Sequence, residues 1–380
     1  MTRPVAAIPR DRDAGRAQRR LTAAVAAHQR AIALRVAGRF APAERACRRA
    51  LAGYAAAEGA HHPDVANALV ELATTLEARD RPVGAARALR RALAILRSAS
   101  DDPDLLRLRL QAQIALAGLD RARGAYADAN RGLQAVLLGA RRRLPSRDPL
   151  TITALNSLGV LRKAQGRYPE AVVYYRKAGR LLGRNRQAHA TLAHNLGGIA
   201  HARGRYAEAE PHARRAVALR AATLGRSHPA WAADVAALAA VVEARGRYDE
   251  AAVLYRRSQT VFRRKLGERS LEFGLGLAGL AAVEQQRGQV ARARALYAQA
   301  LPTLGRLLGR HHPDVALTVN NLAVLERNEQ RLARAEALFR RAGDSFGRTL
   351  GPRHPHTALA RGNLRAVAAA RLKPTGVTRR

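Results

Sequence analysis

A glycine-rich stretch, residues 274–279, has the letters of a dinucleotide-binding loop, with glycine at its first, third and sixth positions. Such a loop functions only between a buried strand and a helix, where its N–H groups reach a pyrophosphate. Leu and Ala recur around this stretch at helical spacing, so we expect a helix whose glycines are packing contacts. The chain contains no Gly-x-Ser-x-Gly, His-Glu-x-x-His or phosphate-loop Gly-Lys-Ser/Thr pattern. We therefore predict no enzyme activity, no catalytic residue and no cofactor.

Histidines are the next candidates for chemistry, as metal ligands. His194 and His201 lie seven residues apart and share one face of a predicted helix. Seven residues rise about 10.5 Å along a helix, too far for two ligands of one ion. Two His-His-Pro-Asp segments, at 61–64 and 311–314, are separated by too much chain to converge. We predict that these histidines form turns and that the chain has no metal site.

Cysteine content and hydropathy indicate the compartment. Cys47 is the single cysteine, so no disulfide can form within the chain. It occupies a helical position that holds large apolar residues elsewhere in the chain, which indicates a packed and unreactive thiol. The Arg-rich N-terminus has no apolar run typical of a secretory signal, and no stretch is apolar enough to span a membrane. These features predict a cytoplasmic protein that does not enter a membrane.

The net charge of +38 is large for 380 residues, and only four of the 67 basic residues are Lys. Such a charge attracts acidic proteins or phosphates. The joint excess of Arg, Ala, Gly and Pro fits a GC-rich genome equally well. Some of the charge is nevertheless ordered, because six basic dyads recur at one phase of the chain, which predicts a basic stripe, or else a solvated outer face. The stripe consists of Arg48, Arg49, Arg90, Arg91, Arg176, Lys177, Arg214, Arg215, Arg256, Arg257, Arg340 and Arg341.

Eight segments share a turn signal, typically Gly-x-Tyr, that ends one helical pattern and begins another. The anchor residues of this signal are Gly38, Asp80, Gly124, Gly166, Gly204, Gly246, Gly288 and Gln330. Their spacings are 42, 44, 42, 38, 42, 42 and 42 residues, which indicates a stack of repeats. All eight residues five positions after an anchor are Ala, and all eight residues seven positions before one are Ala or Gly.

These small residues predict helical hairpins. The helix before each anchor and the helix after it can approach closely if small residues face each other. A glycine anchor adopts the positive-φ conformation that ends the first helix. One hairpin cannot bury its apolar face alone, so consecutive hairpins must stack.

Residues 309–323 and 333–342 closely resemble the 42-residue tetratricopeptide repeat of kinesin light chains, which is also widespread in bacterial regulatory proteins. The resemblance covers roughly residues 18–372. It implies an all-α superhelical solenoid of eight helix pairs, with residues 354–372 as a capping helix. Asp80 and Pro82 depart from the pattern, because they replace the turn glycine and the aromatic residue of the second repeat. We expect disorder in the basic arm 1–17 and in the tail 373–380.

First helices line a concave groove in proteins of this family, and asparagines in that groove hold peptide backbones. Asn offers both a donor and an acceptor to an extended chain. The resemblance implies such a ladder for Asn156, Asn195, Asn320 and Asn321. The full set of predicted groove residues is Asn67, Asn156, Asn195, Asn320, Asn321, Asn363, Arg121, Lys163, His194, His201 and Arg327.

The predicted function is a scaffold that binds an acidic or extended peptide or protein in this groove, in bacterial signalling or regulation. Arg121, Lys163 and Arg327 are the residues that would pair with acidic side chains. The alternative is a nucleic-acid-associated regulator that uses the basic stripe and the basic termini. The aromatic residues that would stack on bases are missing beside the stripe.

Overall fold

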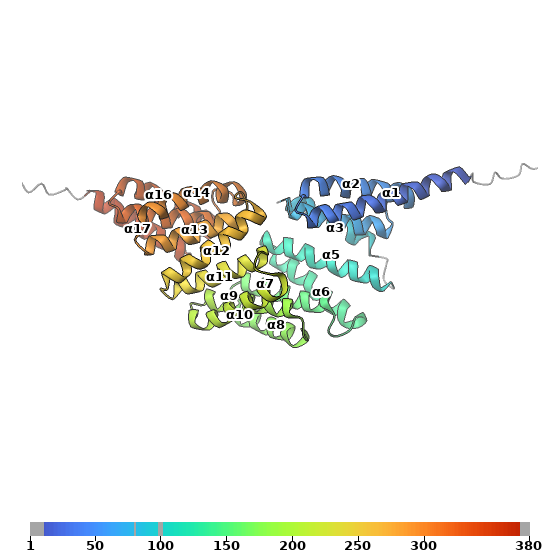
Figure 1. Cartoon of the computed structure of the whole chain (residues 1–380), viewed down its shortest axis with the longest axis horizontal. Helices are drawn as coiled ribbons and strands as arrows, with labels where there is room; N and C mark the ends of the chain where they lie inside the picture. The colour runs from blue at the N-terminus through green and yellow to red at the C-terminus, as the bar shows by residue number, and fades with distance from the viewer. Residues whose placement is uncertain (1–10, 80, 98–101, 373–380) are drawn as a thin grey trace, which may run out of the picture. The chain divides into compact units, whose positions relative to one another are not determined.

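The computed structural model describes residues 11–79, 81–97 and 102–372. Within these residues all regular structure is helical, and there are 17 helices and no strand. Sixteen of them form eight successive hairpins, and α17 (Pro355–Leu372) closes the series as a single capping helix (Figure 1). We call the first helix of each hairpin, with an odd number, a first helix, and its partner a second helix.

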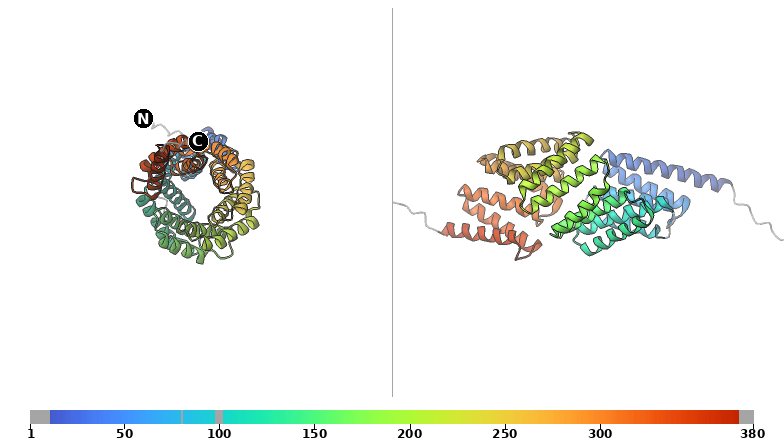
Figure 2. Two further views of the ribbon diagram at one scale, coloured as in Figure 1. Left: turned by 90° about the vertical axis from the view of Figure 1, so that its left-hand side faces the viewer. Right: turned by 90° about the horizontal axis from the view of Figure 1, so that it is seen from below.

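The chain divides into two compact units, residues 1–183 and 184–380. In the first unit the helices are α1 (Asp11–Val36), α2 (Phe40–Glu58), α3 (Pro63–Glu77), α4 (Pro82–Ile95), α5 (Pro103–Ala122), α6 (Tyr126–Arg143), α7 (Pro149–Ala164) and α8 (Tyr168–Leu181). In the second unit α9 (Arg186–Ala202), α10 (Tyr206–Leu224), α11 (Pro229–Ala244), α12 (Tyr248–Leu266), α13 (Leu271–Gln286), α14 (Val290–Leu308), α15 (Pro313–Asn328) and α16 (Leu332–Thr349) precede α17. Within each unit every hairpin packs on the next (Figure 2).

The predicted turns are confirmed. Gly124 has a φ of +81° and lies between α5 and α6, as the anchor glycines of the other repeats do between their own helices. Gln330 occupies the same position with a φ of +58°, and it is the one non-glycine residue with a positive φ in the described part. Asp80 lies outside the described residues.

The close approach of paired helices is confirmed as well. All eight alanines five residues after the anchors are completely buried. In the fourth hairpin the position seven residues before the anchor is Gly159, and a Cβ built there would lie 2.6 Å from Cδ1 of Tyr175. That distance is below any real contact, so the ring of Tyr175 occupies the place of the missing side chain.

The histidines of the two His-His-Pro-Asp segments begin first helices. The Nδ1 atom of His62 accepts the N–H of Asp64 at 3.3 Å, and that of His312 accepts the N–H of Asp314 at 3.2 Å. Each histidine therefore caps a helix whose first residue is proline. The sequence predicts turn-forming histidines, and the structure adds this capping bond.

A second series of glycines ends the second helices, and these turns were not predicted from the sequence. The members have positive φ and are spaced by 42 residues: Gly183, Gly225, Gly267, Gly309 and Gly351. The signal was present, because Leu precedes Gly at all five positions and the spacing matches that of the anchors.

The first helix begins earlier than expected. Helix α1 starts at Asp11, so it includes residues 11–17 of the segment for which the sequence predicts a disordered arm. Arg and Ala are good helix formers, and they predominate where α1 is extended. Residues 1–10 and the tail 373–380 lie outside the described part of the chain.

Candidate binding surfaces

The first-helix face of the first unit carries basic side chains on α5 and on α7. We define this face by Asn67, Arg121, Asn156 and Lys163. Burial raises the pKa of the nearby Glu77 carboxyl, and the charge of Arg121 opposes that rise. Burial lowers the pKa of Lys163, whose ammonium has no ion pair within the described residues. An ammonium that is partly desolvated and unpaired is stabilised by any carboxylate brought next to it.

A pocket of about 200 Å³ opens on this face between α5 and α7. Arg121 and Gly118 line it from α5, Ser157 and Val160 line it from α7, and Leu133 of α6 contributes from beneath. Apolar side chains and the polar groups of Arg121 and Ser157 both contribute to its lining. It is the right size for one side chain of a partner.

In the second unit the predicted groove histidines are engaged with neighbours. Nδ1 of His194 lies 2.8 Å from Oδ1 of the buried Asp234, whose Oδ2 accepts from Nε of Arg220 at 2.9 Å. This chain of contacts joins α9, α10 and α11. The ring of His201 packs on that of Tyr206, with centroids 5.3 Å apart. The structure thus places both histidines in contacts between helices.

Tyrosines of second helices reach the polar ends of first helices in two successive hairpins. The hydroxyl of Tyr255 donates to Oε2 of Glu243 at 3.2 Å, and that of Tyr297 donates to Oε1 of Gln285 at 3.1 Å. Burial raises the pKa of Glu243 to about 7, and the hydrogen bond from Tyr255 only partly offsets this shift.

The predicted asparagines do not all face outward. Asn320 is buried, and its Oδ1 has no hydrogen-bond partner within the described part of the chain. Asn321 hydrogen-bonds Tyr297, and Asn363 accepts from Nη1 of Arg327 at 3.3 Å. Asn156 and Asn195 are half-buried, whereas Asn67 is exposed. The asparagine ladder that the resemblance implies for Asn156, Asn195, Asn320 and Asn321 therefore remains a prediction, and its member Asn320 is buried.

A row of exposed leucines crosses the first helices of the second unit. Its members are Leu275 on α13, Leu317 on α15 and Leu359 on α17. Each follows its predecessor by 42 residues, and each lies four residues into its helix. This apolar column was not predicted, although its 42-residue spacing is visible in the sequence.

The basic stripe is partly neutralised by carboxylates that are buried or, for Glu336, partly buried. Arg48 pairs with Glu44, Arg214 with Glu210, Arg256 with Glu284, and Arg340 with Glu336. Each of these arginines is the first member of its dyad. Two first members, Arg90 and Arg176, and all six second members are exposed and have no ion pair within the described residues. The second members are Arg49, Arg91, Lys177, Arg215, Arg257 and Arg341.

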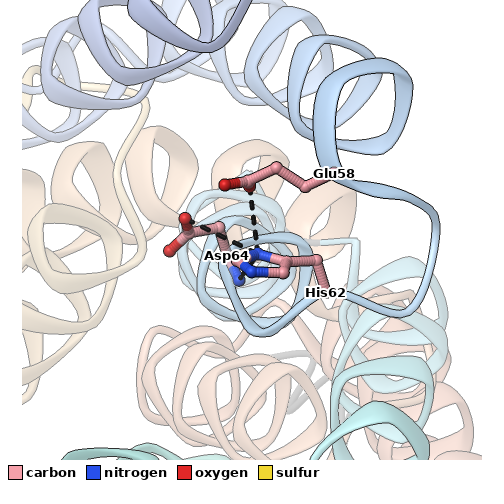
Figure 3. A group of neighbouring side chains, drawn as sticks. All are labelled: Glu58, His62 and Asp64. Carbon is pink, nitrogen blue, oxygen red and sulfur yellow. Dashed lines mark hydrogen bonds and ion pairs between the residues drawn. The ribbon is translucent and has the colours of Figure 1, made fainter. Parts of the chain in front are cut away.

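Glu58, His62 and Asp64 form the one group in the described residues whose ligand atoms lie close enough together for a metal ion (Figure 3). Nδ1 of His62 lies 3.0 Å from Oε2 of Glu58 and also accepts the N–H of Asp64. Position 308, which corresponds to Glu58 in the second His-His-Pro-Asp segment, is Leu. Because Nδ1 of His62 accepts the N–H of Asp64, it carries no proton for Glu58, and the cap at the start of α3 accounts for the position of His62.

Cys47 and the glycine-rich stretch occupy packed positions. Cys47 is completely buried, and burial raises the pKa of its thiol to about 11. The thiolate is therefore disfavoured, as the sequence predicts for a core residue. The glycine-rich stretch lies within α13, where a Cβ at Gly279 would come within 2.6 Å of Cζ of Tyr255. Its glycines are packing contacts, as predicted.

Models of the tetratricopeptide repeat match residues 22–98, 188–264 and 275–342, and a second model of the same repeat matches residues 151–178. These segments make up more than half of the chain. The chain belongs to the tetratricopeptide-repeat family. Its repeats are of the 42-residue kinesin-light-chain type, and the all-α solenoid of eight hairpins with a capping helix is confirmed.

This tetratricopeptide-repeat protein is similar in fold to several solved structures. BtubC (BKLC) from P. vanneervenii is 19% identical, with 60% of this chain and 92% of that chain covered and a TM-score of 0.50. PH0952 from Pyrococcus horikoshii, a signal transduction ATPase with a tetratricopeptide-repeat sensor, is 13% identical over 87% of this chain and 50% of that chain, with a TM-score of 0.57. The apo form of RapI is 13% identical over 81% of this chain and 87% of that chain, with a TM-score of 0.54. No curated protein matches the sequence.

None of the helices in the described residues of this repeat protein is both long and apolar enough to cross a membrane. The family is typically one of interaction scaffolds without catalytic activity, which agrees with the missing catalytic motifs.

Glu243 gives this repeat protein a testable pH dependence. Because the pKa of the folded state, about 7, lies above the ordinary value of 4.5, the folded state binds this proton more tightly than the unfolded state does. The stability that Glu243 contributes is therefore full below pH 4.5 and is lost as the pH rises through 7. Glu243→Gln, which stays neutral, should raise the free energy of unfolding by about 1–2 kcal/mol at pH 8 and little at pH 5. Urea unfolding at both pH values measures this, and an equal effect at the two would contradict it.

Proposed function

We propose that the first-helix face binds an extended, acidic segment of a protein partner, so that the chain acts as a scaffold in bacterial signalling or regulation. The observation that carries this proposal is the pocket between α5 and α7, with Arg121 in its lining. A partner can place an apolar side chain in the pocket and a carboxylate against the guanidinium. Arginine suits that role because its planar fork binds carboxylates through two hydrogen bonds.

Lys163 supports the acidic character of the partner. Its ammonium lies on α7, the helix that forms one wall of the pocket, and it is partly desolvated without a counterion in the described residues. Much of the desolvation cost is thus already incurred in the free protein. A carboxylate brought to this position gains the attraction with less additional loss of hydration.

The second unit supports an extended partner with apolar side chains. Leu275, Leu317 and Leu359 recur once per hairpin on its first helices. Exposed apolar side chains arranged in a row indicate an interaction surface. Arg327 lies on the same helix as Leu317, about 15 Å further along it, and can contact an acidic group of a partner that extends beyond the row. The sensor role of the repeats in PH0952 is the precedent for a signalling setting, and the similarity to that protein is one of fold.

Selection from a display library of random short peptides tests the proposal. We expect the selected peptides to be enriched in Asp and Glu next to an apolar residue. Arg121→Glu and Lys163→Glu should each weaken the best peptide at least about tenfold in fluorescence anisotropy, because each replaces attraction by repulsion.

Arg91→Glu is the matched control, because it makes the same charge change on an exposed stripe residue of the same unit. It should alter peptide binding less than about twofold. Selected peptides without acidic enrichment, or an Arg91→Glu effect as large as that of Arg121→Glu, would reject the proposed face. Binding of random duplex DNA that falls steeply with salt and is lost in Arg91→Glu would instead establish the alternative, a nucleic-acid partner.

A further inference from the structure

The second unit has a larger pocket on its second-helix side, where α10, α11 and α12 meet. Its volume is about 640 Å³, within the range of sites that hold small molecules. Val217 and Ala221 of α10, Trp231 and Leu238 of α11, and Val261 of α12 form an apolar lining. None of these residues belongs to the predicted peptide groove.

Three arginines surround this apolar lining. Arg214 is held in place by Glu210 and Glu250, each with an N–O distance of 2.7 Å. Arg226, in the turn after α10, and Arg257 of α12 have no ion pair or side-chain hydrogen bond within the described residues. The pocket therefore combines a large apolar interior with two uncompensated guanidinium groups. A fully apolar ligand would not pair with the two guanidinium groups, and a small inorganic anion would not cover the apolar lining.

An equivalent pocket in the first unit shows which residues make this one distinctive. That pocket, of about 490 Å³, is lined by Arg90 and Ala94 of α4, by Arg97 in the turn after α4, and by Arg109 of α5. Arg90, Ala94 and Arg97, counted from the anchor Asp80, occupy the same repeat positions as Arg214, Ala218 and Ala221, counted from the anchor Gly204. The second unit therefore has Ala221 where the first has Arg97. Trp231, the only tryptophan in the chain, adds an aromatic wall, and its buried Nε1 has no acceptor in the described part.

We propose that this pocket binds a small amphipathic carboxylate, with its apolar body against Trp231 and its head group between Arg226 and Arg257. Apolar contact with the lining provides affinity, and the two guanidinium groups select a negative head group. The ligand would be bound independently of a peptide on the first-helix face. The chain would then carry two sites, one for a protein partner and one for a small molecule.

Trp231 supplies the measurement, because it is the one indole in the chain, its emission can be excited selectively over that of the nine tyrosines, and bromine quenches indole on contact. Bromine-labelled undecanoate, below its micelle concentration, should quench the fluorescence saturably. The corresponding alcohol should bind at least about tenfold more weakly, since it cannot pair with the arginines. Arg226→Ala and Arg257→Ala should each weaken undecanoate at least about threefold.

Matched variants separate a site from general attraction to a basic protein. Arg341→Ala removes the same dyad position as Arg257→Ala, but four helices later, and should change binding less than about twofold. Ala221→Leu should abolish saturable quenching by filling the pocket, with its helical circular dichroism unchanged. Equal binding of acid and alcohol would overturn the proposal, as would equal effects of Arg341→Ala and Arg257→Ala. A peptide that ends in Leu-Leu with a free carboxylate is the competitor. If it displaces undecanoate at a concentration lower than that at which undecanoate itself binds, the pocket would be reassigned to a protein partner.

Discussion

Replacing Gly159 by Ala should lower the free energy of unfolding by about 1–3 kcal/mol, although alanine is the better helix former. Gly159 lies inside α7, and its Cβ would lie 2.6 Å from Cδ1 and 2.8 Å from Cζ of Tyr175. Tyr175 is completely buried, so its ring cannot move away without displacing other core residues. The overlap therefore costs more than the gain in helix propensity.

Gly118→Ala is the matched control for this effect. Gly118 lies inside α5 of the same unit, and a Cβ at that position would meet nothing within 4 Å. The same chemical change should raise stability there by about 0.5–1 kcal/mol. Urea unfolding followed by far-ultraviolet circular dichroism measures both variants, and a shift of the same sign in both would contradict the packing argument.

A second substitution should restore the loss. The second and third hairpins combine Ala with Leu at the two corresponding positions, as Ala73 with Leu89 and Ala117 with Leu133. Gly159→Ala combined with Tyr175→Leu should therefore be more stable than the sum of the two single effects predicts, by at least about 0.5 kcal/mol. Additive effects would show that the ring is not the obstacle.

The fold was predictable because the same residue types recur at the same positions in every repeat. A single Gly-x-Tyr is weak, but eight anchors with Ala at one phase define hairpins whose helices must approach closely. Tyrosine orientation was not predictable in the same way. Tyr175 packs against Gly159 of its own hairpin, whereas Tyr255 packs against Gly279 of the next hairpin. Both tyrosines stand at the same column position, so the column cannot show which glycine each ring contacts.

The candidate surfaces were predictable in residue type but not in pairing. The dyads identified exposed arginines, yet the sequence analysis took no account of the glutamates beside them. Glu44 precedes Arg48 by four residues, a spacing that favours ion pairs on a helix, and this signal was available. The arginines that reach the same carboxylate from the next hairpin, such as Arg79, depend on how the hairpins stack. The pocket beside Trp231 likewise depends on what neighbouring helices leave unfilled.

Glu210 is the carboxylate for which these pairings predict the largest electrostatic effect. It is buried at the end of α10 that faces the turn between α11 and α12. It accepts from Nε of Arg214 at 2.8 Å, from Nη2 of Arg247 at 2.5 Å, and from Nη1 of Arg245. The contacts with Arg245 and Arg247 join one hairpin to the next. Burial opposes ionisation of Glu210, but the bonds from Arg247, Arg214 and Arg245 outweigh it and lower its pKa to about 2.

The pKa shift determines how the contribution of Glu210 varies with pH. The folded-state pKa is lower than the ordinary value of 4.5, so the unfolded state binds this proton more tightly. The stabilisation is full above pH 4.5 and is lost as the pH falls toward 2. The three arginine side chains remain between 39% and 48% exposed, so solvent screens the attraction and limits its size. We expect Glu210→Gln to cost about 2 kcal/mol at pH 7.

Glu208→Gln is the control for this prediction. Glu208 lies on the same helix and contacts Arg205 at 3.5 Å, but its side chain is 63% exposed, so its loss should cost less than about 0.5 kcal/mol. Urea unfolding of both variants at pH 7 and at pH 3 provides the comparison. The Glu210→Gln deficit should shrink at pH 3, because the wild type then loses part of the same stabilisation. A deficit that stays constant between the two pH values would mean that the variant disrupts packing rather than charge, and that the junction between these hairpins does not depend on the ionised carboxylate.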